Sequence, residues 1–359
     1  MKKTKIWAVA MMLLTFLFIV GCSADTTKPA QSESANNNKS ESTSKGTTSK
    51  GGGGKEELEI AWVHMNSAAQ SEQRAKKGFE DFIKKSGYKW NFSVVDSKGS
   101  GQNLASNIED AVQRKVDAII ISMADLRAAK ASIAEAEKAG IPVFSVDSGW
   151  TPGIVVDVTS NNYVMSSKVS SYLVDRLGGE GNIIAFKMAE HHGVRKRGEV
   201  LDTIVKENPG IKVLEEHNID YTNFYEDTLK TMEDYIARYG DEIDAVWAGW
   251  DEPAMAAAAA IQAAGISKDK IFVTGIDGHP PAMEEMKKGS PIAATVAQGF
   301  ETMGEKIAGY IYSIKTEGKP IDQVINSTTV YVDTPLITDK NLPEDGVAPY
   351  KAKDFYSSN

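Results

Sequence analysis

Short apolar runs alternate with amphipathic stretches from Leu58 onward. The runs predict strands at 58–65, 90–95, 118–121 and 143–146, and apolar residues at helical spacing predict helices at 73–86, 103–114 and 128–139. Residues 118–121 are apolar throughout, which is typical of a parallel strand buried on both faces. Alternation of such elements predicts a doubly wound parallel sheet with right-handed crossovers.

The same pattern begins again near Val164. It predicts helices at 164–177, 197–207, 226–237 and 254–264, and strands at 182–186, 212–217, 245–248 and 271–274. A weak internal repeat joins the halves, because the segment 117–141 is echoed by 244–266 and each precedes a strand that ends in aspartate, Asp147 or Asp277. The predicted fold class is therefore α/β, with two similar doubly wound parallel-sheet lobes.

The N-terminus predicts export and lipid anchoring. Three lysines, at positions 2, 3 and 5, precede the apolar stretch Ile6–Val20, which fits the core of a signal peptide and is short for a transmembrane helix. This stretch ends in Gly21-Cys22, which resembles the bacterial lipobox and implies a signal peptide over 1–22 with acylation of Cys22. An ordinary secretory signal with a chance cysteine is the alternative. Residues 23–55 hold no large aliphatic or aromatic residue and predict a flexible tether.

Composition excludes several classes of function. The chain of 359 residues suggests two domains, and its net charge of -9 is unfavourable for general nucleic-acid binding, which needs clustered basic residues. Cys22 is the single cysteine, so a disulfide framework and a site built from several thiolates are excluded. No P-loop, dinucleotide fingerprint, Gly-x-Ser-x-Gly or His-Glu-x-x-His motif occurs, so we expect no enzyme, cofactor or metal site.

The candidate chemistry lies where predicted strands end. In open α/β sheets ligands bind beyond the carboxyl ends of the strands, so Asp147 and Asp277 should face a cleft between the lobes. Carboxylates accept hydrogen bonds from vicinal hydroxyls, which suits a sugar or polyol. The alternative is that either aspartate closes a turn or caps a helix.

Further candidates surround these two positions. Arg195 follows a strand and could donate a two-pronged hydrogen bond into the cleft, whereas Arg197 is interpreted as a solvated charge at a helix start. Trp150 and Trp250 could contact the C–H face of a sugar ring, and Asn66 lies at the same rim. His191 and His192 are interpreted as loop histidines. Because they lie close to Arg195 in the sequence, an anionic ligand stays an alternative.

Over residues 58–339 the chain resembles the type I periplasmic binding proteins, in their ribose/galactose-type branch. The matching segments, in order, are 117–121, 139–147, 195–199, 251–266, 275–278 and 292–298. The resemblance implies two lobes joined by three hinge crossings, near 161–162, 298–299 and 327–330. The implied division is 56–160 with 299–328 for the N-terminal lobe, 161–298 with 329–347 for the C-terminal lobe, and a tail at 348–359.

The resemblance also implies site residues. Asp147, Arg195, Asp277 and Gln298 fall where this branch contacts its ligand, and Phe224 or Tyr225 provides a further stacking aromatic. Three positions depart from the ribose binders: Trp250 replaces an asparagine, Ser148 replaces an arginine, and the loop at 66–70 keeps Asn66 without the aromatic pair. The expected ligand is a sugar or polyol, with ribose itself in doubt.

The expected function is a solute-binding lipoprotein on the outer face of the bacterial cytoplasmic membrane. Its partners would be the small ligand, the permease subunits of an ABC importer, and the membrane through Cys22. Alternatives are a ligand-sensing module for a chemoreceptor or sensor kinase, a binder of a non-sugar molecule, a repressor core, and a secreted enzyme. The lipobox and tether occupy the end where a repressor needs its DNA-binding headpiece.

Overall fold

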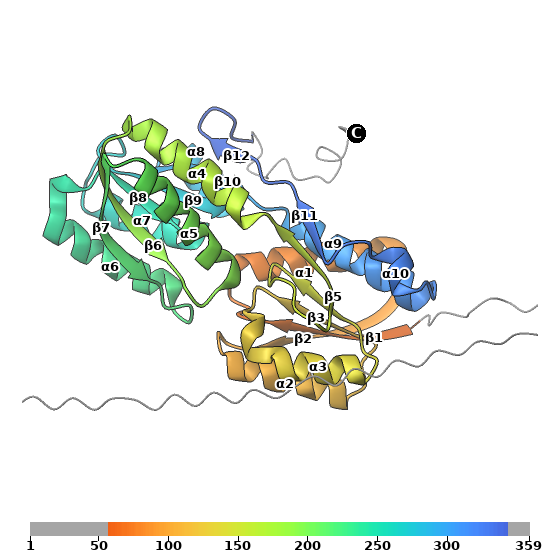
Figure 1. The fold of residues 1–359 in the computed structure, drawn as a ribbon. Coiled ribbons are helices and arrows are strands. Elements are labelled where there is room, and N and C mark those ends of the chain that lie inside the picture. The colour runs from red at the N-terminus through yellow and green to blue at the C-terminus, as the bar shows by residue number, and fades with distance from the viewer. Residues whose placement is uncertain (1–56, 344–359) are drawn as a thin grey trace, which may run out of the picture. The chain divides into compact units, whose positions relative to one another are not determined.

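A computed structural model describes residues 57–343, which form two sheets of six strands each (Figure 1). The strand order of the first sheet is β11 (Thr329–Val332), β5 (Ile154–Ser160), β4 (Val143–Val146), β3 (Ala118–Ser122), β1 (Glu57–His64) and β2 (Lys89–Asp96). The order of the second is β12 (Leu336–Thr338), β10 (Ile292–Ala297), β9 (Phe272–Asp277), β8 (Ala245–Ala248), β6 (Gly181–Lys187) and β7 (Ile211–Asn218). Among these neighbours only β10 and β12 are antiparallel. The prediction of two α/β lobes with parallel sheets is confirmed.

Helices cover both faces of the first sheet because its strands are apolar on both faces. The side chains of successive residues in β3 point to opposite faces of the sheet. Ile120 therefore packs with α1 (Gln70–Ser86) and α9 (Phe300–Ile311), whereas Ile119 and Ile121 pack with α2 (Gly101–Gln113) and α3 (Lys130–Lys138). The short α10 (Ile321–Val324) follows α9 in the chain. The buried indole of Trp62 donates a 2.7 Å hydrogen bond to Ser122 Oγ, which satisfies its polar atom.

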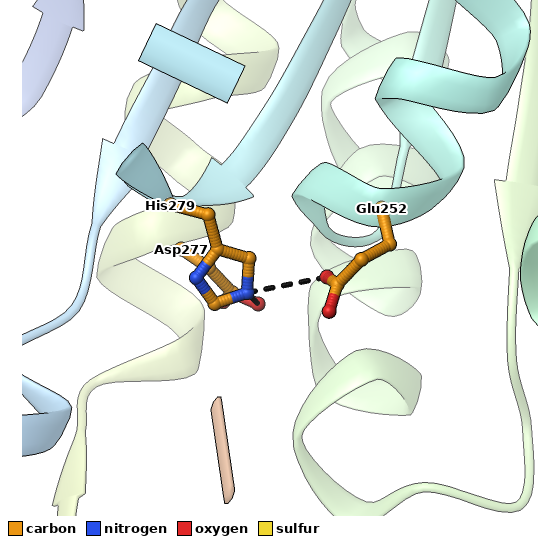
Figure 2. A group of neighbouring side chains, drawn as sticks. All are labelled: Glu252, Asp277 and His279. Atoms are coloured by element: carbon orange, nitrogen blue, oxygen red, sulfur yellow. Dashed lines mark ion pairs between the residues drawn. The ribbon is translucent and has the colours of Figure 1, made fainter. Parts of the chain in front are cut away.

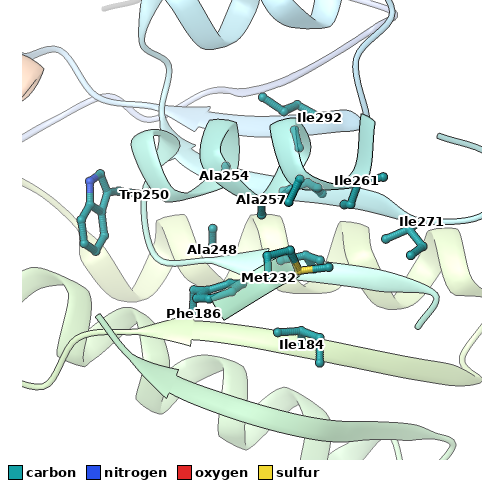
Figure 3. Packing of buried hydrophobic residues seen from close by; sticks show 14 of the residues in the cluster. Ile184, Phe186, Met232, Ala248, Trp250, Ala254, Ala257, Ile261, Ile271 and Ile292 are labelled. Atoms are coloured by element: carbon teal, nitrogen blue, oxygen red, sulfur yellow. The ribbon is translucent and has the colours of Figure 1, made fainter. Parts of the chain in front are cut away.

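The second sheet is built in the same way. Ile184 and Phe186 of β6 pack against α6 (Phe224–Tyr239) and α7 (Asp251–Ala263), where Ala254, Ala257 and Ile261 form the buried face (Figure 3). The opposite face is covered by α4 (Asn162–Leu177) and α5 (His192–Glu207), while α8 (Pro280–Lys287) connects β9 to β10. No helix in residues 57–343 is long and apolar enough to cross a membrane.

The structure adds elements that the sequence did not predict and moves one crossing. The added elements are strands β5, β10, β11 and β12 and helices α8, α9 and α10. In β5, the buried Asp157 and the terminal Thr159-Ser160 interrupt the apolar pattern. The third crossing was placed too early: β11 pairs with β5 in the first sheet and β12 with β10 in the second, so the chain crosses at 333–335. Residues 329–332 therefore belong to the first lobe, since backbone pairing decides membership. The predicted signal peptide (1–22), tether (23–55) and tail (348–359) lie outside the described residues.

A buried carboxyl group in the first lobe makes stability depend on pH. Glu72 is fully buried. It accepts a 2.8 Å hydrogen bond from Met65 N and another hydrogen bond from Ser122 Oγ. Burial raises the pKa of Glu72 to about 8. A raised carboxyl pKa contributes stability that is complete below the unfolded value and is lost as pH rises through the folded value.

We expect Glu72→Gln to weaken this dependence, because an amide replaces the protonated carboxyl. Between pH 5.5 and 7, above the unfolded and below the folded pKa, the wild-type free energy of unfolding should fall more steeply than that of the variant, by about 1.4 kcal/mol per pH unit. Urea unfolding at several pH values measures both slopes. Glu80→Gln, on the exposed side of the same helix, is the control. Parallel curves for Glu72→Gln and wild type would contradict the prediction.

Candidate functional site

Three strands end in residues with unusual backbone conformation. Met123 follows β3, Asp147 follows β4 and Asp277 ends β9, with φ of 53°, 46° and 127°. Residues other than glycine adopt positive φ rarely and at a cost of about 1–3 kcal/mol, and such residues are concentrated at functional sites. All three line one chamber between the two sheets, which we call the inner chamber.

Arg197 of α5 connects the two aspartates. Its Nη1 donates to Asp277 Oδ1 at 3.3 Å and to Gly249 O at 2.8 Å, while its Nη2 lies 3.9 Å from Asp147 Oδ2. Its Nε donates to Asn162 Oδ1 at 2.7 Å. The guanidinium is thus held in a fixed orientation by partners on every side, which preorganises it for recognition.

The two aspartates differ electrostatically although both are buried. Burial raises the pKa of Asp147, and Arg197 offsets this only in part. Burial acts in the same direction on Asp277, but Arg197 and His279 outweigh it and lower the pKa of that carboxyl. Asp277 is therefore the firmly charged partner of Arg197, because two cationic side chains adjoin it.

Amide and hydroxyl groups complete the polar cluster. Thr159 Oγ1 donates to Asp147 Oδ1 at 2.6 Å, and Gln298 Nε2 donates to Asp277 Oδ1 at 2.6 Å. The other amide atom, Gln298 Oε1, is buried and has no hydrogen-bond partner among the described residues 57–343. An unsatisfied buried acceptor costs about 1–3 kcal/mol, so a ligand hydroxyl that donated to it would recover this energy.

Apolar side chains form the rest of the inner chamber. Trp250 and Phe300, from opposite lobes, line it beside the polar cluster, together with Met123, Met188, Val194 and Tyr221. Its free volume is about 30 Å³, room for a group the size of one water. A larger ligand must therefore replace the pairings among these side chains and move the walls apart.

The lobes contact one another beside the chamber. Asn66 Nδ2 donates to Tyr221 O at 3.1 Å, and Gln70 N donates to Glu252 Oε1 at 3.1 Å. Arg74 of α1 donates to Asp277 O at 3.1 Å and to Gln298 O at 3.0 Å. Residues of the first lobe thereby fix the backbone that carries two of the polar ligand candidates.

A buried ionic cluster lies next to Asp277. His279 Nε2 is 3.2 Å from Glu252 Oε2 and 3.4 Å from Asp277 Oδ2 (Figure 2). Burial alone would lower the pKa of His279, but the two carboxylates raise it to about 10. These three groups could bind a divalent cation, yet Arg74 and Arg197 place two guanidinium charges against them. We interpret the cluster as an ionic support that orients Asp277.

The structure brings four of the eight predicted ligand residues together. Asp147, Trp250, Asp277 and Gln298 all line the inner chamber. The other four, Asn66, Trp150, Arg195 and Phe224, are not among the residues that line it. Asn66 bonds across the lobes as described above, and Phe224 packs against Trp250 with ring centroids 5.9 Å apart. Trp150 is 45% exposed and donates its indole N–H to Ile154 O. The position of Cys22 is outside the described residues.

Arg195 and Arg197 exchange the roles expected from the sequence. Arg197 is 2% exposed, so its interpretation as a solvated charge was wrong. Arg195 lies at the rim, where its Nη1 is 3.3 Å from Asp125 Oδ2 of the other lobe. The signal was present in helix α5, because Val194, Arg197 and Leu201 share its buried face at helical spacing.

His191 lies in the bend before α5, as expected of a loop histidine, but its role in capping the helix was not predicted. Its Nδ1 accepts hydrogen bonds from Gly193 N and Val194 N, at 3.1 and 3.3 Å, so it caps α5. Burial lowers the pKa of His191 to about 4, which leaves the imidazole neutral. His192 packs against Gly149 of the first lobe, where an added β-carbon would lie 2.5 Å from its ring.

Comparison with known proteins agrees with this architecture. The model of the periplasmic binding protein domain matches residues 60–319. The ribose import binding protein RbsB of Bacillus subtilis (strain 168) is 31% identical over 259 residues, covering 70% of this chain and 79% of the relative. A xylitol-binding protein of Mycolicibacterium smegmatis is 25% identical over 269 residues, covering 74% of this chain and 73% of the relative.

A solved structure gives the same result. The ABC sugar transporter subunit from Rhodobacter sphaeroides 2.4.1 superposes with a TM-score of 0.70 at 25% identity, covering 79% of this chain and 99% of the other. The names of these proteins describe ribose import binding, xylitol binding and ABC sugar transport. The family match, the two parallel-sheet lobes and the polar cluster between them agree, and the chain belongs to the periplasmic binding protein family, in its type I, ribose/galactose-type branch.

Proposed function

We propose that this protein captures one sugar or polyol between its lobes and delivers it to an ABC importer from the outer face of the cytoplasmic membrane. The observation that carries the proposal is the inner chamber, where Asp147, Arg197, Asp277 and Gln298 surround one point beside Trp250. These groups offer acceptors and a forked donor next to an aromatic face.

This chemistry fits a polyhydroxylated ligand. Adjacent hydroxyls both donate and accept, so they can bond to a carboxylate and a guanidinium at once. The C–H face of a sugar ring packs on an aromatic side chain such as Trp250. Two relatives named for ribose import and xylitol binding support the same ligand class.

Binding should also favour the closed arrangement of the lobes. Asp147 and Phe300 come from the first lobe, whereas Arg197, Trp250 and Asp277 come from the second. A ligand that contacts both sides gains its full interaction energy only when they are together. A permease could then distinguish the loaded protein by its closed form.

Membrane attachment is proposed from the lipobox-like Gly21-Cys22 and the polar tether that follows. Two or more acyl chains anchor a protein stably, whereas one does not. We expect the wild-type protein to incorporate a labelled fatty acid in cells and Cys22→Ser to incorporate none. Labelling of the variant, or no labelling of the wild type, would contradict lipid anchoring.

A thermal-shift panel tests the ligand class. The protein would be the mature chain with Cys22→Ser, and the panel would hold pentoses, hexoses, polyols, amino acids, nucleosides and small carboxylates. A ligand at 100 times its Kd adds about 2.7 kcal/mol of stability and raises Tm by a few degrees. We expect such a shift with a sugar or polyol. A shift confined to an amino acid, nucleoside or acid would refute the proposed ligand class.

A further inference from the structure

A second, larger chamber lies between the lobes. The first lobe contributes Met65, Gly99 and Asp125, and the second contributes Glu190, Asn218 and Asp220. We call it the outer chamber, and its free volume is about 380 Å³. Pockets for small organic ligands measure about 300–1,000 Å³, so this chamber alone is large enough for a sugar ring.

Contacts between the lobes bound the outer chamber. Arg195 Nη1 lies 3.3 Å from Asp125 Oδ2 across the gap. Gly99 packs so closely on Thr222 that an added β-carbon would lie 3.1 Å from Thr222 Cγ2. The chamber is therefore a product of lobe contact and belongs to the same arrangement that forms the inner chamber.

The two chambers share walls. Met123, His191 and Tyr221 line both of them. The inner chamber, with about 30 Å³, carries the polar cluster, while the outer chamber carries most of the free space. A ligand bound by the polar cluster can therefore extend past these three residues into the outer chamber.

His191 supplies a donor at this junction. Its Nδ1 accepts two backbone hydrogen bonds, so the proton of the neutral ring lies on Nε2. The residue is 9% exposed and lines both chambers, so the Nε2–H is placed to donate to a group that lies between them. A donor of this kind would donate a hydrogen bond to a ligand oxygen that links a group in one chamber to a group in the other, such as a glycosidic oxygen.

The lining of the outer chamber indicates what the second group would be. Carboxylates of Asp125, Glu190, Asp220 and Asp227 lie along it, and the neighbouring guanidinium groups, Arg127 and Arg195, both pair with Asp125. The remaining negative charge repels a phosphate, whereas carboxylates accept hydrogen bonds from hydroxyls. The apolar side chains of Met65, Met123 and Ile219 suit the C–H surface of a second ring.

We propose that the outer chamber is a second subsite, and that the preferred ligand is a neutral glycoside, such as a disaccharide, in preference to a free monosaccharide. The first ring occupies the polar cluster and the second hydroxylated unit occupies the outer chamber. This inference rests on the proposed function, because it assumes that the first ring is a sugar.

Matched ligands test the inference by calorimetric titration of the mature chain with Cys22→Ser. D-Ribose, D-galactose and D-glucose would each be compared with the methyl glycoside, a β-linked disaccharide and a phosphate monoester. For the sugar that binds, we expect a glycoside to bind at least about tenfold more tightly than the free sugar, and the phosphate at least about tenfold more weakly.

Glu190→Trp would fill the outer chamber from the second lobe, at a side chain that is hydrogen-bonded to Asn218 of the same lobe. It should remove the advantage of the glycoside while leaving the affinity for the free sugar unchanged, whereas Thr203→Trp on the exposed side of α5 should alter neither. A free sugar that binds more tightly than all its glycosides, or a glycoside advantage that survives Glu190→Trp, would overturn the subsite while leaving the proposed function standing. If no sugar, free or substituted, bound to the parent protein, the subsite would fall, and the proposed function would fall with it if no polyol bound either.

Discussion

Replacing Arg197 with alanine should reduce ligand affinity by at least about 100-fold. Its guanidinium links Asp147 to Asp277 and is held by Asn162 and Gly249. Loss of one partner of a buried charge pair costs about 2–5 kcal/mol, because the remaining charge is left unpaired in a poorly solvated site. Titration of the ligand found in the panel measures the loss of binding, and urea unfolding measures the accompanying loss of stability.

Two further variants keep this result interpretable. Arg197→Lys retains the charge but not the planar fork, so we expect a folded protein with clearly weakened binding. Arg195→Ala removes a partly exposed rim contact and should weaken binding of a monosaccharide by less than about tenfold. Abolished binding in Arg195→Ala together with normal binding in Arg197→Lys would show that the site is centred on the rim.

Gly304→Ala should destabilise the first lobe severely. Helices α1 and α9 approach so closely that a β-carbon at Gly304 would lie 1.9 Å from Ala75 O, and one at Gly78 would lie 1.9 Å from Glu301 O. These neighbours are backbone atoms and cannot rotate away, so the helices must separate. We expect a loss of more than about 3 kcal/mol, or failure to fold, measured by urea unfolding.

Gly309→Ala is the matched control on the same helix. The nearest atom to its new β-carbon is Phe82 Cε2 at 4.0 Å, so alanine should be neutral or stabilise the helix by up to about 1 kcal/mol. The two helices also support the site, because Arg74 of α1 binds Glu301 of α9 and Gln298 O. Equal stability of the Gly304→Ala and Gly309→Ala variants would refute the close packing.

The fold was largely predictable because its signals are local. The apolar run 118–121 fixes a strand buried on both faces, and the repeated strand-then-aspartate pattern placed Asp147 and Asp277 at equivalent edges of two sheets. Strand β5 was not predicted because it contains a buried aspartate, Asp157, which accepts a hydrogen bond from Ser145 Oγ. This is a tertiary contact, and the pattern of apolar residues along the chain does not reveal it. The third crossing depends on which sheet accepts β11, and that is likewise a tertiary choice.

The site was predictable only where backbone position determines it. Asp147, Asp277 and Gln298 follow strand ends, so topology alone brings them together. The choice between Arg195 and Arg197 depends on the rotation of α5 about its axis, which the spacing of Val194 and Leu201 encodes. The remote positions of Trp150 and Phe224 depend on loop paths and on packing against Trp250, for which the sequence offers no periodic signal.

A crystal structure of the mature chain bound to the best ligand from the panel tests the central claim most directly. The account predicts one ligand between the lobes, with hydroxyl oxygens within hydrogen-bond distance of Asp147, Arg197 and Asp277 and a ring face on Trp250. Gln298 Oε1, which has no hydrogen-bond partner within the part of the chain that the structure describes, should accept a hydrogen bond from the ligand. A ligand bound outside the cleft, or inside it without contact to Arg197 and the two aspartates, would contradict the account.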